Sequence, residues 1–146
     1  MRRALLSVGG IGFVPRGPAT AGTLAGAAAF FVLRPKPATQ IALFVASATL
    51  GQIYAAPLAG SGVRDPQYIV IDEVAGVWLA LLGLPPTAIT CGSGAVLFRA
   101  LDKLKPGPIG AIDRRGGRWS VMGDDLAAGL LTNLLLRVGT AALGRR

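Results

Sequence analysis

The sequence contains no histidine and a single cysteine, and these two absences exclude several kinds of active site. Without histidine, no imidazole can act as a general base, as a nucleophile that accepts a phosphoryl group, or as a metal ligand. The lone cysteine, Cys91, permits neither an intramolecular disulfide nor a cysteine-rich zinc site. Since Cys91 lies in an uncharged, mostly apolar stretch, we interpret it as a small packing residue and not as a thiol nucleophile.

Charged residues are also scarce. They make up 15% of the chain against 52% hydrophobic residues, so the polar side chains are too few to cover an ordinary water-exposed surface. The net charge of +8 comes from arginines and lysines placed between apolar runs, which fits anionic lipid headgroups better than nucleic acid. The composition therefore predicts a membrane as partner and no nucleic acid, and the length of 146 residues predicts one domain spanning residues 1–146.

The order of apolar runs and chain breakers predicts an all-α protein, a compact hydrophobic bundle of about five to six helices with membrane-inserted or membrane-apposed helices. Residues 1–23 and the turn at 106–108 are expected to be irregular. Residues 39–59 carry no charge and are long enough to cross a bilayer, so we expect a span there, with a core helix as the alternative. Further helices are expected over residues 24–33, 65–82, 93–105 and 123–144.

All seven carboxylates lie between residues 65 and 125, and the uncharged stretch 74–98 predicts a hairpin that brings them to one side. Asp72 and Glu73 stand among apolar residues, where burial without a partner would cost several kcal/mol. A cation shared by several carboxylates would remove that cost, and an ion pair with arginine or lysine is the alternative. Because the available ligands are all oxygens, the expected cation is Mg²⁺, for which Mn²⁺ could substitute.

The acidic residues further along the chain have both structural and functional interpretations. Arg99 and Asp102 lie one helical turn apart, which favours either a simple ion pair or a cation and a carboxylate of one active site. Asp124 could cap the last helix, and this makes Asp125 the better candidate for a ligand.

Two segments could bind phosphate. The glycine-rich stretch 10–23 could present backbone N–H groups and the hydroxyl of Thr20 at a helix N-terminus, although a flexible turn is the alternative. Asp113 and Arg114 are interpreted either as a solvated turn or as part of a phosphate-binding site.

Three blocks of the sequence together resemble the phosphatidylglycerophosphatase A family. Residues 10–23 are similar to its N-terminal pattern Gly-x-Gly-x-x-Pro-x-x-Pro-Gly-Thr-x-Gly-Ser/Thr, although Ala19 stands where the family usually has glycine. Residues 65–76 match its Asp-Pro-x-x-x-Val-x-Asp-Glu-x-x-Gly pattern, and residues 98–109 match Phe-Arg-x-x-Asp-x-x-Lys-Pro-x-Pro-Ile. Asp113-Arg114 and the Asp-Asp-x-x-Ala-Gly pattern of residues 124–129 follow, so the likeness spans most of the chain.

The resemblance implies an all-α enzyme of phospholipid biosynthesis at the bacterial inner membrane, with its active site facing the cytoplasm. Such an enzyme hydrolyses phosphatidylglycerophosphate to phosphatidylglycerol and inorganic phosphate with the help of Mg²⁺. A non-catalytic membrane scaffold and a phosphatase for a soluble phosphate monoester are the alternatives. The residues expected to serve this site are Asp72, Glu73, Asp102, Arg99 and Lys105 in catalysis, Asp72, Glu73, Asp102 and Asp125 as metal ligands, and Thr20 and Arg114 at the substrate phosphate.

Overall fold

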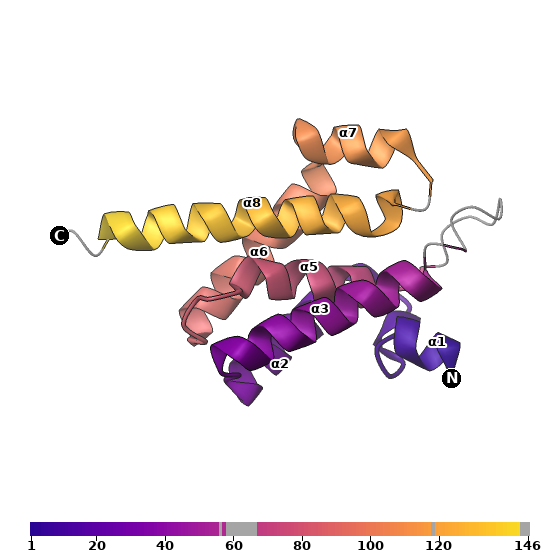
Figure 1. The fold of residues 1–146 in the computed structure, drawn as a ribbon, viewed down its shortest axis with the longest axis horizontal. Helices are drawn as coiled ribbons and strands as arrows, with labels where there is room; N and C mark the ends of the chain where they lie inside the picture. The colour runs from indigo at the N-terminus through magenta and orange to yellow at the C-terminus, as the bar shows by residue number, and fades with distance from the viewer. Residues whose placement is uncertain (56, 58–66, 118, 144–146) are drawn as a thin grey trace.

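The computed structural model describes residues 1–55, 57, 67–117 and 119–143. All regular secondary structure in these residues is helical, which confirms the prediction of an all-α fold (Figure 1). The helices are α1 (Arg2–Leu6), the short 3₁₀ helix η1 (Ile11–Phe13), α2 (Pro18–Leu33), α3 (Pro37–Tyr54), α5 (Ile71–Leu81), α6 (Ala88–Leu104), α7 (Pro108–Arg115) and α8 (Ser120–Leu143).

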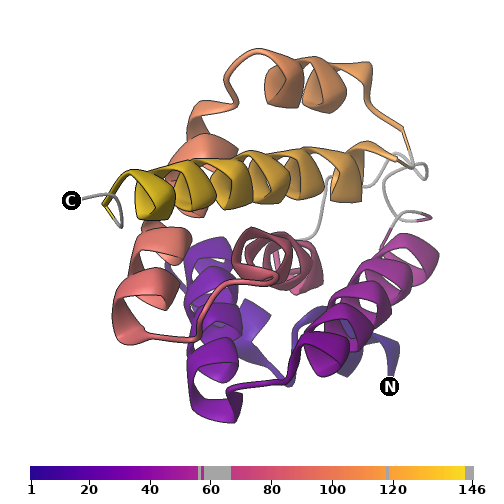
Figure 2. The ribbon, with the colours of Figure 1, turned by 60° about the vertical axis from the view of Figure 1, so that its left-hand side comes forward.

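Helix α5 is the central element of the bundle. It contacts α2, α3, α6 and α8, and Figure 2 shows it nearly end-on between them. Most of its side chains are buried, and Val77, Trp78 and Leu81 form one core cluster with Phe30 of α2 and Phe98 of α6. A helix that is apolar on nearly every side is stable only when other helices cover it. Asp72 and Glu73, in its first turn, are therefore buried at the end of this central helix.

Helices α5 and α8 touch backbone to backbone. A Cβ atom added to Gly129 of α8 would lie 2.3 Å from the carbonyl oxygen of Gly76 in α5. A Cβ atom added to Gly76 would lie 2.9 Å from the carbonyl oxygen of Asp125 and 2.5 Å from the ring of Phe98. Any side chain at these positions would force the helices apart. The two glycines thus allow α8 to carry Asp125 against the start of α5.

The other end of α5 is tied to α8 by polar contacts. The Asn133 side-chain amide donates hydrogen bonds to the carbonyls of Leu79, Ala80 and Leu82 at 3.2, 3.0 and 2.9 Å. Arg137 donates to the carbonyl of Leu82 at 2.9 Å and to the side-chain oxygen of Asn133 at 2.8 Å. The last carbonyls of a helix lack the usual N–H donor from the following turn, and burying them unpaired would be costly. Of the three, the carbonyl of Leu79 also accepts from the backbone N–H of Leu82 at 3.2 Å. Asn133 therefore fixes how far α8 can slide along α5.

The five predicted helices all begin at other residues than predicted, by two or three residues in α3 and α8 and by five or six in α2, α5 and α6. Helix α5 begins at Ile71, and residues 67–70 are not helical, so the predicted start at Asp65 is wrong; Asp65 itself lies outside the described residues. Helix α2 begins at Pro18, because proline is well suited to the first helical position. Helix α6 begins after Thr87, whose hydroxyl accepts a hydrogen bond from the backbone N–H of Thr90 at 3.1 Å.

The described residues contain seven α-helices, where about five to six were predicted. The additional helices are α1 and α7, in segments that were predicted to be irregular or left unassigned. Pro106 does end α6, as predicted, but Pro108 also serves as the first residue of α7. A proline pair around one glycine is thus a corner between two helices.

The predicted membrane span over residues 39–59 is not confirmed, and its residues 56, 58 and 59 lie outside the described part of the chain. Helix α3 ends at Tyr54 and packs along α5, and in the described part of the chain no helix combines the length and the apolar character needed to cross a bilayer. Polar side chains interrupt the apolar surface of α3. The buried Gln40, for example, donates to the carbonyl of Pro35 at 2.9 Å and accepts from the backbone N–H of Gly83 at 2.8 Å.

We predict that Gly129→Ala destabilises the protein by about 1–3 kcal/mol, because the added methyl group collides with the α5 backbone. The control is Gly139→Ala in the same helix, where the added Cβ meets no described atom within 4 Å. That variant should be unchanged or more stable by about 0.5–1 kcal/mol. Urea unfolding followed by circular dichroism measures both, and equal shifts for the two variants would contradict the close contact.

Candidate active site

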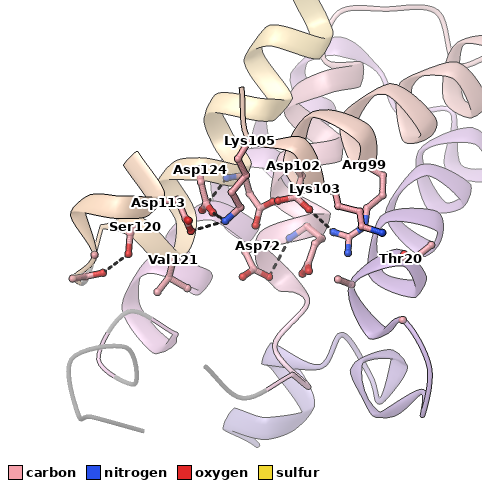
Figure 3. Close-up of a pocket in the computed structure, with 16 residues that line it drawn as sticks. Thr20, Asp72, Arg99, Asp102, Lys103, Lys105, Asp113, Ser120, Val121 and Asp124 are labelled. Atoms are coloured by element: carbon pink, nitrogen blue, oxygen red, sulfur yellow. Dashed lines mark hydrogen bonds and ion pairs between the residues drawn. The ribbon is translucent and has the colours of Figure 1, made fainter. Parts of the chain in front are cut away.

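A cavity of about 900 Å³ opens where the N-terminal ends of α2, α5 and α8 meet the C-terminal end of α6 (Figure 3). Its wall carries charges of both signs. Residues as far apart in the sequence as Thr20 and Asp125 line it together, as the predicted return of the chain requires. The charged residues of the wall are Asp72, Glu73, Arg99, Asp102, Lys103, Lys105, Asp113, Asp124 and Asp125.

Three buried carboxylates form a compact cluster, which we call the acidic triad: Asp72 and Glu73 of α5 and Asp125 of α8. One oxygen from each lies within 4.8 Å of the others. Oε2 of Glu73 and Oδ1 of Asp125 are buried without a hydrogen-bond partner among the described residues. Buried oxygens left in this state are costly, and a cation that binds all three carboxylates would satisfy them. The acidic triad therefore has the chemistry of a metal site.

The electrostatics of the triad support this interpretation. Burial raises the pKa of Glu73 to about 7; a hydrogen bond with Asp72 opposes the shift and the charge of Asp125 adds to it. Burial also raises the pKa of Asp125 well above its ordinary range, and the charges of Asp72, Asp102 and Asp124 raise it further. Like charges this close do not ionise together without compensation. Protons or a bound cation are therefore needed to neutralise the cluster.

Lys105 connects three helices beside the triad. Its Nζ lies 2.5 Å from Oδ1 of Asp113 in α7 and 2.7 Å from Oδ2 of Asp124 in α8 (Figure 3). Burial alone would lower the pKa of Lys105, but the two carboxylates outweigh it and raise that pKa. Asp124 was predicted as a possible helix cap, and this is wrong because α8 already begins at Ser120. Asp113 and Asp124 are instead the ion-pair partners of Lys105.

The cations on the other side of the cavity come from one face of α6. Arg99 forms the predicted ion pair with Asp102, one helical turn away. Lys103 follows Arg99 by four residues and has no ion-pair partner in the part of the chain that the structure describes. Thr20, at the start of α2, lines the same wall beside Arg99 (Figure 3). Two cations and a hydroxyl facing a carboxylate cluster are suited to hold a phosphate.

The cavity brings together most of the residues that the sequence predicted for one site. Arg114 is not among the described residues that line the cavity, and Cys91 is buried in the core, where burial raises the pKa of its thiol. Lys103 and Ser120 line the cavity without having been predicted, although the helical spacing of Lys103 from Arg99 indicates a shared face. The predicted residues on the wall are Thr20, Asp72, Glu73, Arg99, Asp102, Lys105 and Asp125.

Comparison with known proteins shows the family to which the chain belongs. The family model for phosphatidylglycerophosphatase A matches residues 4–140. The chain is 35% identical to phosphatidylglycerophosphatase A of Escherichia coli over 133 residues, covering 88% of this chain and 77% of that protein. It is also 35% identical to the protein of that name from Haemophilus influenzae over 132 residues, covering 86% and 81%.

A third relative carries a different name. A protein of Bacteroides thetaiotaomicron, provisionally named a phosphatidylinositol-3-phosphatase, is 33% identical over 144 residues, which cover 92% of this chain and 91% of that protein. No solved structure matches the chain significantly. The chain belongs to the phosphatidylglycerophosphatase A family, a family of phosphatases, and this confirms the prediction from the three sequence blocks.

We predict that Glu73→Gln stabilises the metal-free protein at pH 8 but not at pH 4. The pKa of Glu73 in the folded protein is about 7, above the ordinary value of 4.5. The folded state therefore binds this proton more tightly, so the contribution of Glu73 to stability is fully present below pH 4.5 and is lost as the pH rises through 7. Glutamine cannot ionise, and it avoids a loss on the order of 3 kcal/mol at about 1.4 kcal/mol per pKa unit.

Urea unfolding in the presence of a chelator, followed by circular dichroism at both pH values, measures this difference. A Glu73→Gln variant that is no more stable than the wild type at pH 8 would contradict the conclusion that burial destabilises the ionised carboxylate of Glu73.

Proposed function

We propose that the chain removes the terminal phosphate of phosphatidylglycerophosphate and releases phosphatidylglycerol and inorganic phosphate. The observation that carries this proposal is the buried acidic triad facing Arg99 and Lys103 across one cavity. The two relatives named phosphatidylglycerophosphatase A support the choice of substrate. The Bacteroides relative is named for another lipid with a phosphate monoester, so the shared chemistry is a monoester on a glycerophospholipid headgroup.

We assign the triad to Mg²⁺. Asp72, Glu73 and Asp125 would hold the ion, and Asp102 stands close enough for its charge to raise the pKa of Asp125. The donors are oxygens only, and two of them are buried without a hydrogen-bond partner among the described residues, which suits a small hard cation. When bound, such an ion supplies the Lewis acidity that polarises the phosphoryl oxygens.

The remaining side chains of the cavity bind and orient the phosphate. The guanidinium of Arg99 is held by Asp102 and has further N–H groups to donate, while Lys103 brings a second positive charge. Together with the Thr20 hydroxyl, they stabilise the negative charge that grows on the phosphoryl oxygens. Lys105 is already paired with two carboxylates, so we assign it a positioning role. It orients Asp124, the neighbour of Asp125.

A lipid substrate requires contact with a bilayer. The net charge of +8 favours an anionic leaflet, because each cation near such a surface contributes about 1 kcal/mol. We therefore propose that the protein works at the bacterial inner membrane with its active site facing the cytoplasm.

The experiment is the release of inorganic phosphate from phosphatidylglycerophosphate in detergent micelles. We predict activity with Mg²⁺ and none with a chelator. Asp72→Asn and Glu73→Gln should lower kcat on the order of a hundredfold or more, since even outer partners of metal ligands are worth 10–100-fold. The same variants should lose the increase in melting temperature that Mg²⁺ gives the wild type.

Asp113→Asn is the matched control, an acidic residue of the same cavity that is half-exposed and outside the triad. We expect it to lose less than about tenfold. Full activity without divalent cations would refute the metal assignment. Equal turnover of glycerol 3-phosphate would refute the lipid assignment, and preferred turnover of phosphatidylinositol 3-phosphate would replace the substrate.

A further inference from the structure

A second, apolar cavity runs into the active site. It has a volume of about 310 Å³, lies between α2 and α6, and shares Thr20, Arg99 and Lys103 with the large cavity. The remainder of its wall is apolar apart from Thr23, with Leu24 of α2 and Val96 of α6 on its two sides. We call this cavity the α2–α6 groove. Because the groove shares residues with the active site, a molecule bound in the groove would also contact active-site residues.

The two helices beside the groove expose an uncharged surface. Leu24 is 57% exposed and Val96 is 71% exposed, although both are apolar. Helix α2 contains no charged residue, and α6 contains none before Arg99. Figure 2 shows α2 beside α6, and Leu24 and Val96 of these two helices line the same groove. An apolar groove whose side chains are exposed in this way is a candidate binding surface.

From the large cavity to the α2–α6 groove, the lining side chains change from acidic to basic and then to apolar. The acidic triad is in the large cavity, the cations Arg99 and Lys103 lie at the junction, and the groove beyond them is apolar. A glycerophospholipid with a terminal phosphate monoester has its parts in a matching order: an anionic headgroup, which suits the proposed metal site and the cations beside it, and then apolar acyl chains, which suit the groove. The larger apolar cavity of about 460 Å³ between α1, α2, α3 and α5 shares no lining residue with the active site. It therefore lacks this continuity.

We propose that the α2–α6 groove binds an acyl chain of the lipid whose phosphate monoester lies in the active site. This inference rests on the proposed function and adds to it a physical basis for choosing a lipid over a water-soluble monoester. The chain leaves the junction at Arg99 and Lys103 and follows Leu24 and Val96 toward the bilayer. Burial of its methylene groups favours binding and leaves the phosphate chemistry unchanged.

The test uses Leu24→Asn and Val96→Asn, which make the groove polar at exposed positions that tolerate the change. We expect KM for phosphatidylglycerophosphate to rise at least about tenfold, corresponding to about 1.4 kcal/mol of lost binding, with kcat within about twofold. Competitive inhibition by inorganic phosphate should keep its inhibition constant, because the phosphate site is untouched. The wild type should favour longer acyl chains over short ones, and the variants should lose this preference.

The matched controls are Ile41→Asn on α3 and Val138→Asn on α8, where the side chains are 53% and 68% exposed. They remove similar apolar side chains away from the groove and should leave KM unchanged. Groove variants that behave like these controls would overturn the inference while leaving the phosphatase assignment intact. A groove variant that changes the oligomeric state would identify a second copy of the chain as the occupant and also overturn it. A wild type that releases no phosphate from the lipid would refute the proposed function itself.

Discussion

The backbone contact between α5 and α8 is the constraint on which the rest of the structure depends. Gly76 and Gly129 let the two helices approach until a single methyl group would no longer fit, and Asn133 fixes their relative position from the other end of α5. This contact carries Asp125 to the carboxylates that begin α5. Packed helix axes usually lie about 8–10 Å apart, depending on the side chains at the contact. A larger side chain at either glycine would push α8, and Asp125 with it, away from α5.

The acidic triad is costly to the fold and useful to the function for the same reason. Burial and mutual repulsion raise the pKa values of Glu73 and Asp125, so the folded chain without a cation holds charge poorly in this place. Such a site favours cation binding, because the cation neutralises the repulsion among buried carboxylates that no other group of the triad neutralises. Lys105 reduces the repulsion in the cavity, because it forms ion pairs with Asp113 and Asp124, which would otherwise add two more negative charges. Stability lost at an active site is a common trade-off in enzymes.

Helix α6 links the polar and apolar parts of the proposed substrate site. Arg99 and Lys103 lie near its C-terminal end and face the large cavity, while Val96 one turn earlier faces the α2–α6 groove. Side chains three and four residues apart share a helix face, so one helix can present the phosphate-binding cations and the apolar wall in continuous order. A rigid helix also keeps the distance between the two parts constant. The proposed binding of the phosphate and the acyl chain of one lipid therefore requires no conformational change between these two parts of α6.

The sequence by itself determined the all-α class, because the order of apolar runs and chain breakers is a local property of the chain. The family followed from the three sequence blocks that resemble phosphatidylglycerophosphatase A. The cost of burying isolated charges indicated Asp72 and Glu73, and the resemblance grouped them with Asp102 and Asp125. It also indicated Arg99 with Asp102, since the two lie one helical turn apart. Only the tertiary structure decided that α5 begins at Ile71, that Pro108 starts a helix, and that Lys105 pairs with Asp113 and Asp124. It alone revealed the α2–α6 groove and the contact of Gly76 with Gly129. These features depend on which helices pack together. Packing brings together residues that are far apart in the sequence, and their spacing in the sequence does not predict that they are in contact.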